Sequence, residues 1–370
     1  MSRTTLSKNL TRRAALGRGA AVLAAAAPIS RARAAAAPLK VAFVYVSPIG
    51  DAGWTYQHDL GRREMERVLG ARVRTTVVES VPEGADAERV MRDLARQGHG
   101  LIVATSFGYL EPALRVAAEF PAVTFEHVGG WKLAPNLGTV NARWYEGRYL
   151  AGLIAGATSR SGVAGYVAGF PVPEVVQGLD AFALGMRAAK PDASVKVTWL
   201  ETWFDPVREA EASQGLLNQG ADVLANHTAS PAVAQVAQRH ARDGVRFLGY
   251  QSDMRAYAPD AQLASVTQHW GAFDTALARS VLDGTWRPRA AWGGLADGMV
   301  RLSALDAKLP ADVRALVERR HAAIVAGTFE PFAAPLVDNR GRVRLASGTL
   351  DGSAIRSLDW LVAGVVGSMP

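Results

Sequence analysis

Aromatic and hydrogen-bonding side chains gather in six short segments of the sequence: 47–54, 105–109, 201–206, 226–230, 250–253 and 268–271. Indole and phenyl rings can stack on the faces of a flat ligand, while hydroxyl, amide, imidazole and carboxylate groups can hydrogen-bond to its edge. This combination favours a site that binds a small aromatic molecule. The leading stacking candidates are Trp54 and Trp203, and Ser106 and His227 are candidates for the polar edge.

Each of these residues also has a purely structural interpretation. A tryptophan at the end of a strand is as often a core residue as a stacking platform. Asp51 and Asp205 precede predicted helices and can act as helix caps. Six such segments in one chain are nevertheless hard to explain by capping alone.

Motifs of enzymes and metal proteins are missing. The chain has no cysteine, and its seven histidines show no metal-ligand spacing. The run Gly50-Asp51-Ala52-Gly53 lacks the third glycine and the basic residue of phosphate-binding loops, and neither a Gly-x-Ser-x-Gly nor a His-Glu-x-x-His motif occurs. We therefore expect no catalytic residues, no metal and no cofactor.

The segments follow predicted β-strands in a βαβ pattern. The first series has strands at 40–46, 72–79, 100–105 and 122–127, and helices at 54–69, 85–97 and 109–119. The second has strands at 162–168, 194–201, 222–226 and 246–249, and helices at 173–189, 206–218 and 231–243. The carboxyl ends of parallel strands share one edge of their sheet, so the six segments should meet at such edges.

The pattern predicts an α/β fold of two doubly wound, parallel-sheet lobes. A strand at 262–269 and a helix at 272–282 are expected to return the chain to the first lobe, and 332–338 with 342–345 should form a hairpin. The predicted N-terminal lobe is 38–142 with about 250–292. The predicted C-terminal lobe is 143–249 with about 293–370.

The first 37 residues resemble a twin-arginine signal peptide. They contain seven Lys and Arg residues, no acidic residue, the pair Arg12-Arg13 and a short apolar run. Without those seven, 34 basic residues balance 34 acidic ones, which removes the reason to expect nucleic-acid binding. With no cysteine to carry a lipid, we expect a soluble, monomeric, periplasmic protein without a lipid anchor.

The exported protein should therefore begin between about Ala34 and Leu39 and carry no acyl chain. N-terminal sequencing of the extracytoplasmic fraction measures this. An intact Met1 in that fraction would contradict the expectation.

Several motifs together resemble the basic membrane protein family of substrate-binding proteins, which includes purine nucleoside receptors. They are Gly50–Trp54 (Gly-Asp-Ala-Gly-Trp), Thr105–Gly108 (Thr-Ser-Phe-Gly), 143–152 with its Glu-Gly-x-Tyr-Leu-Ala-Gly run, 249–253 and 281–286. The resemblance implies a type I periplasmic-binding fold, with lobes joined by a three-strand hinge, that delivers purines to an ABC permease. It implies that Asp51 contacts the base, Trp54 and Trp203 stack on it and Asp253 holds ribose hydroxyls. Ser106, Phe107 and Tyr145 lie within the matching motifs and join the predicted site.

One position departs from the family pattern. Nucleoside binders carry a lysine after the strand equivalent to 263–267, where this chain has Gln268 or His269, followed by Trp270. If Trp270 fills the ribose volume, a free base such as adenine is preferred; if it points into the core, an ordinary nucleoside pocket remains. Gln268 and Trp270 complete the predicted ligand-binding residues. An exported α/β enzyme acting on a nucleoside-like substrate, or a sensory subunit, is the alternative from another functional class.

Overall fold

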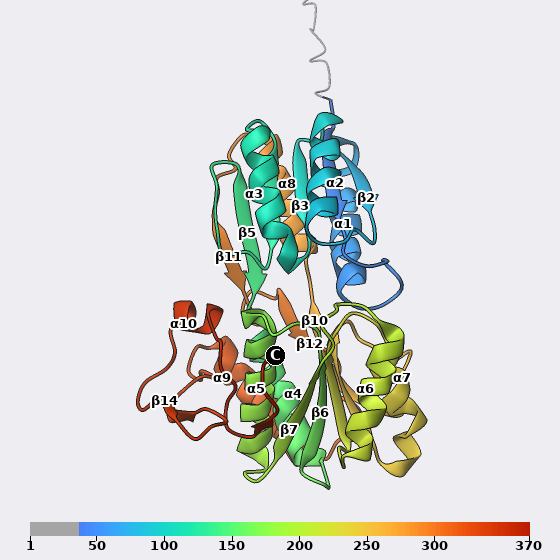
Figure 1. Cartoon of the computed structure of the whole chain (residues 1–370), viewed down its shortest axis with the longest axis vertical. Coiled ribbons are helices and arrows are strands. Elements are labelled where there is room, and N and C mark those ends of the chain that lie inside the picture. Colours follow the sequence, from blue (N-terminus) through green and yellow to red (C-terminus); the bar gives the residue numbers. More distant parts are fainter. Residues whose placement is uncertain (1–36) are drawn as a thin grey trace, which may run out of the picture. The chain divides into compact units, whose positions relative to one another are not determined.

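The computed structural model describes residues 37–370, which form one compact unit. Residues 1–36 of the predicted signal peptide lie outside the described residues. Within the described unit, each of two sheets is covered by helices on both faces (Figure 1). The predicted α/β fold of two doubly wound lobes is thus confirmed. No helix among residues 37–370 is long and apolar enough to cross a bilayer.

The sheet of the first lobe has six parallel strands in the order β11-β5-β4-β3-β1-β2. Its strands are β1 (Leu39–Val44), β2 (Val73–Val78), β3 (Leu101–Ala104), β4 (Thr124–Val128), β5 (Leu137–Ala142) and β11 (Ala290–Gly293). Its helices are α1 (Trp54–Leu69), α2 (Ala85–Arg96), α3 (Leu110–Glu119) and α8 (Gly271–Leu282), with short 3₁₀ turns at Gly70–Arg72 and Phe107–Tyr109.

The central strands of this sheet are apolar at consecutive positions because both faces are buried. Phe43 of β1 packs with Met65 of α1 and Leu277 of α8 on one face. Ile102 of β3 packs with Met91 of α2 on the other. These helices hold the strands so that their carboxyl ends share one edge.

The sheet of the second lobe has the order β12-β10-β9-β8-β6-β7-β15, in which only β12 is antiparallel to its neighbour. Its strands are β6 (Val163–Ala168), β7 (Ser194–Trp199), β8 (Val223–His227), β9 (Arg246–Gln251), β10 (Gln262–Gln268), β12 (Val300–Leu302) and β15 (Val365–Val366). Its helices are α4 (Trp144–Thr158), α5 (Pro173–Ala189), α6 (Pro206–Asn218), α7 (Ala232–Arg239) and α9 (Ala311–Val325), with a 3₁₀ turn at Ala241–Asp243.

The strongest family-like motif, at 143–152, forms the first half of α4 and has a packing role. Helices α4 and α5 lie so close together that a Cβ at Gly152 would sit 2.1 Å from the carbonyl oxygen of Phe182. Only glycine allows this approach without moving a backbone. The motif therefore builds the lobe rather than the pocket.

Strand β10 lies in a different sheet from the one we expected. We predicted that 262–269 returns the chain to the first lobe, but β10 pairs with β9 and β12 in the second sheet. The helix that follows, α8, does return to the first lobe, where it packs on α1. An apolar strand pattern shows that a strand is buried but not which sheet contains it, and this explains the difference.

The chain crosses between the sheets three times: from β5 to α4, from β10 to α8 and from β11 to β12. Backbone bonds join the crossovers, with Arg143 N–H donating to Gly293 O (2.7 Å) and His269 N–H to Met299 O (2.9 Å). Arg143 also donates from its side chain to Glu146 (2.6 Å) and Asp297 (2.9 Å). These bonds hold the three connecting segments side by side.

The predicted hairpin is present as β13 (Leu336–Val337) and β14 (Val343–Leu345). The short helix α10 (Gly352–Arg356) follows it, and β15 then adds to the edge of the second sheet beside β7. The C-terminal segment thus packs on the second lobe.

Candidate ligand-binding pocket

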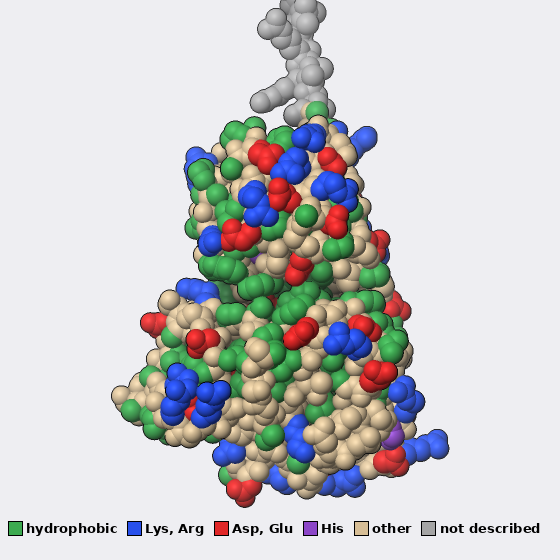
Figure 2. Space-filling view, in the orientation of Figure 1, with side chains coloured by type: hydrophobic (Ala, Val, Ile, Leu, Met, Phe, Trp, Pro, Cys, Tyr) green, Lys and Arg blue, Asp and Glu red, His purple; other side chains and the backbone are tan. Residues whose placement is uncertain are grey.

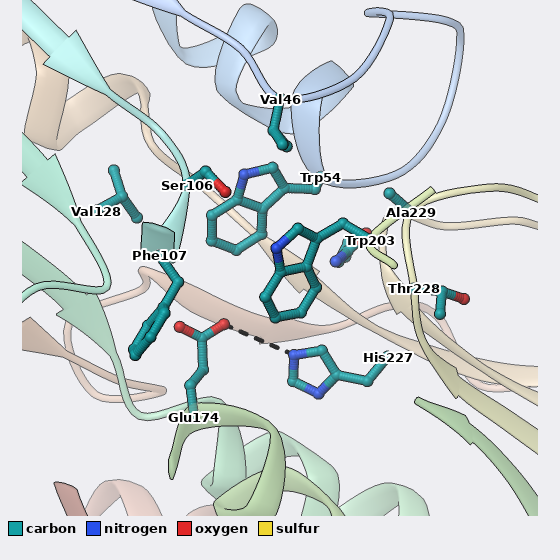
Figure 3. A pocket seen from close by; sticks show the side chains of 11 residues that line it. Val46, Trp54, Ser106, Phe107, Val128, Glu174, Trp203, His227, Thr228 and Ala229 are labelled. Atoms are coloured by element: carbon teal, nitrogen blue, oxygen red, sulfur yellow. Dashed lines mark ion pairs between the residues drawn. The ribbon is translucent and has the colours of Figure 1, made fainter. Parts of the chain in front are cut away.

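A pocket lies where the carboxyl ends of strands from both sheets meet (Figure 3). Its walls come from loops that follow β1, β3 and β4 in the first lobe and β6, β7, β8 and β9 in the second. The lining residues are Val46, Trp54, Ser106, Phe107, Val128, Glu174, Trp203, His227, Thr228, Ala229 and Gln251. Hydrophobic side chains also gather around the hollow seen on the face shown in Figure 2.

Trp54 presents a fixed aromatic surface from the first lobe. It opens helix α1, and its indole N–H donates to Thr105 O at 2.6 Å. Trp144 and Trp270 contact it edge-on, with ring centroids 5.7 and 6.3 Å away. With only 9% of its surface exposed, Trp54 has little freedom to rotate.

Trp203 is the aromatic wall from the second lobe, in the loop between β7 and α6. Its ring meets Phe170 edge-on at 4.8 Å. Its N–H donates to Glu83 of the first lobe at 3.1 Å, and Glu83 also accepts from Ser106 Oγ (2.6 Å) and Gly108 N–H (2.9 Å). Glu83 therefore links this indole to the opposite lobe.

The polar part of the pocket is formed by His227, at the end of β8, and Glu174, in the first turn of α5. His227 Nε2 lies 3.6 Å from Glu174 Oε1, and the two side chains are only 2% and 11% exposed. Burial raises the pKa of Glu174 to about 8. Burial, together with the positive charge of Arg148, holds the pKa of His227 well below its ordinary value. Both groups are therefore mainly uncharged at neutral pH.

Arg148 is the buried cation beneath this pair. Its guanidinium carbon lies 4.8 and 4.9 Å from the ring centroids of Tyr166 and Tyr250, and Tyr250 in turn contacts His227 at 4.3 Å. No nitrogen of the guanidinium has a hydrogen-bond partner among the described residues. Aromatic faces can stabilise a desolvated cation by about 2 kcal/mol or more, so stacking replaces hydrogen bonds here.

The structure brings five of the ten predicted ligand-binding residues into this pocket: Trp54, Ser106, Phe107, Trp203 and His227. Three others lie elsewhere with partners of their own. The exposed Asp51 accepts from Tyr257 Oη, and the exposed Asp253 accepts from Gln262 Nε2 (2.5 Å). Tyr145 is buried against Phe332, at 5.4 Å between ring centroids.

Gln268 and Trp270 are both buried outside the pocket. The indole N–H of Trp270 donates to Gln268 Oε1 at 3.1 Å, and its ring stacks on His58 at 4.4 Å. Trp270 lies at the start of α8. Its side chain packs behind Trp54 and does not face the pocket. Trp270 is thus in the core and does not fill a ribose volume, so the departure from the family pattern at this position gives no reason to prefer a free base.

Glu174, Glu83 and Gln251 were not among the residues predicted from the sequence. A signal for Glu174 existed, because the segment after β6, at 169–174, is a strand end like the six that were singled out. Gln251 lies in the predicted segment 250–253, but the residue predicted there to bind the ligand was Asp253. No motif pointed to Glu83, which precedes α2. Residues 37–370 contain no group of three or more acidic or histidine side chains placed to hold a metal.

Comparisons with known proteins agree with this architecture. Residues 39–325 match the family described as ABC transporter substrate-binding protein PnrA-like. A purine-binding protein of Brucella abortus is 45% identical over 90% of this chain and 94% of its own length. A Haloferax volcanii protein named as a candidate ABC transporter glucose-binding protein is 32% identical over 90% of this chain and 81% of its own.

A solved ABC transporter solute-binding protein from Aeropyrum pernix shares the fold. It superposes with a TM-score of 0.69 at 21% identity, covering 80% of this chain and 94% of its own. The fold is therefore that of the type I periplasmic binding proteins. From the match over residues 39–325 and its relatives, the chain belongs to the PnrA-like family of ABC transporter substrate-binding proteins.

Proposed function

We propose that this protein captures a purine between its lobes and delivers it to an ABC permease, with a free base such as adenine preferred over a nucleoside. The observation that carries the proposal is the pair of indoles, Trp54 and Trp203, that line one pocket from opposite lobes. A flat ring between them would bury both faces, and base stacking on aromatic side chains contributes about 1–3 kcal/mol per base. The purine-binding relative from Brucella abortus supports the same ligand class.

The hydroxyl groups that line the pocket are already engaged, which supports a base rather than a nucleoside. Ser106 Oγ is already bonded to Glu83, and Thr228 Oγ1 donates to Glu209 at 2.8 Å. Asp253, which the family resemblance implied as the ribose contact, lies outside the pocket. A ribose would therefore find no free hydroxyl donor in this pocket and would have to share Glu174, His227 and Gln251 with the base.

We infer a soluble, monomeric protein in the periplasm, without a lipid anchor, that binds its ligand unchanged and releases it to the permease. Rotation of the lobes about the three crossovers would distinguish the loaded form from the empty one. Conversion of purines or nucleosides to products by the purified protein would contradict this role.

Adenine should bind more tightly than adenosine, by on the order of tenfold to a thousandfold. Burying an unpaired hydroxyl costs roughly 1–3 kcal/mol, and 1.4 kcal/mol is a factor of ten in affinity. Native mass spectrometry identifies any retained ligand, and competition calorimetry then ranks adenine, hypoxanthine, guanine, their nucleosides and glucose.

Equal or tighter binding of a nucleoside would refute the preference for a free base but leave the purine proposal intact. Binding of glucose with no binding of any purine would refute the purine proposal itself.

A further inference from the structure

The carboxyl group of Glu174 reaches across the pocket with no hydrogen bond of its own. It starts from α5 in the second lobe, and a Cβ built on Gly129, directly after β4 in the first lobe, would lie 3.3 Å from its Oε2. The 3.6 Å separation from His227 Nε2 is longer than a hydrogen bond. Both carboxyl oxygens are therefore available to a ligand that enters between the lobes (Figure 3).

Four titratable or charged side chains lie around the pocket near this carboxyl, two of them neutral and two charged. The titratable neighbours on the second-lobe side are His227 on β8 and Tyr250 on β9. Arg148 on α4 carries a fixed positive charge close to His227, but it stacks on tyrosine rings and forms no salt bridge with Glu174. Across the pocket, Glu83 is occupied by Ser106 and Trp203.

A buried carboxylate without a paired cation is less favourable than the neutral acid. The direction of the pKa shift agrees with this, since burial raises the pKa of Glu174 to about 8. The acid form is therefore the main form at neutral pH, before any ligand binds.

Building on the proposed function, we propose that Glu174 determines purine specificity by binding the ring edge as a neutral carboxylic acid. Its O–H donates to a ring nitrogen while its C=O accepts from the adjacent N–H. This arrangement fits any purine edge that places an acceptor beside a donor, such as ring N1 and the 6-amino group of adenine. An ionised carboxylate offers acceptors only and would instead favour two adjacent donors, as on guanine.

The proposal fixes the sign of the pH dependence. Below its pKa, Glu174 is protonated and affinity is full. As pH rises through about 8 the acid ionises, and the fraction able to donate falls about tenfold per further pH unit. Adenine affinity should therefore fall roughly tenfold between about pH 7 and about pH 9.

Calorimetric titration of the full chain with adenine from about pH 6 to about pH 9 tests this, using wild type, Glu174→Gln and Glu211→Gln. Glutamine keeps one donor and one acceptor but cannot ionise. Glu174→Gln should bind within about threefold of wild type near pH 6 and stay constant to pH 9. Glu211→Gln, an exposed position on α6, should follow the wild-type curve.

Proton uptake on binding, measured in buffers of different ionisation enthalpy, provides a second readout. Binding near pH 9 should take up close to one proton, and Glu174→Gln corrects for any protonation of adenine itself. A pH-independent wild type, or affinity that rises with pH together with a preference for guanine, would overturn the neutral-acid proposal. If wild type binds no purine at any pH, the proposed function fails instead, so the two failures are distinguishable.

Discussion

Replacing Gly53 with alanine is expected to weaken adenine binding by on the order of ten- to a hundredfold, corresponding to about 1.4–2.8 kcal/mol. Gly53 belongs to the first lobe but contacts the strand ends of the second. Its N–H donates to Ser252 Oγ at 2.8 Å, and a Cβ on Gly53 would lie 2.1 Å from Ala229 O. Because real Cβ atoms do not come that close to a backbone oxygen, the lobes would have to separate at the edge of the pocket.

Gly50→Ala is a matched control for this effect. Gly50 lies in the same loop and also has a positive φ, +57° against +94° for Gly53, so both variants carry backbone strain, on the order of 1–3 kcal/mol each. A Cβ on Gly50 would meet nothing within 4 Å. Gly50→Ala should therefore lose stability in thermal unfolding but keep its affinity. Wild-type affinity in Gly53→Ala would show that the bound state does not need the contact with Ala229.

The regular elements were predictable because local patterns define them. Helices α1, α5 and α6 begin and end at the predicted residues, and α5 and α6 each start with a proline, which suits the first turn of a helix. The eight strands of the two predicted series lie within about two residues of their expected positions, because runs of buried apolar residues mark them. Strands β5, β11 and β15 were not predicted. The sheet that contains β10 was not predictable, because that depends on long-range pairing.

The location of the pocket was predictable from the sequence, but the full set of side chains that line it was not. The rule that ligands bind at the carboxyl ends of parallel strands placed Trp54, Ser106 and Trp203 at the edges of their sheets, where the structure has them. It could not determine which way a side chain points after the strand ends. Asp253 turns to Gln262, while Gln251, two residues earlier and at φ +69°, lines the pocket.

The direction of the Trp270 side chain was likewise not predictable from the sequence, and this affects the functional proposal. The missing lysine near position 268 led us to expect that this indole fills the ribose volume, whereas it packs behind Trp54. The preference for a free base now depends on the occupied hydroxyls of Ser106 and Thr228 instead. Sequence could identify the departure from the family pattern but not the space that the new side chain occupies.

Trp203→Ala is expected to weaken adenine binding by about 1–3 kcal/mol, or roughly 5- to 150-fold, because one face of the ring would lose its stacking partner. Trp203→Phe separates stacking from hydrogen bonding, since phenylalanine keeps a ring but lacks the N–H that donates to Glu83. If stacking dominates, the phenylalanine variant should recover most of the affinity in calorimetry. If the link to Glu83 dominates, both variants should bind equally weakly.

Trp199→Ala is the matched control, because Trp199 ends β7 outside the pocket and donates to Ser368 O at 3.0 Å. It should bind adenine like wild type. Trp54→Ala, by contrast, should also lower thermal stability, since removing a large buried aromatic side chain costs about 3–5 kcal/mol. Trp203 is only partly buried, so its loss should affect binding far more than folding. Unchanged affinity in folded Trp203→Ala would mean that the ligand does not stack on this indole and that the purine proposal has lost its main support.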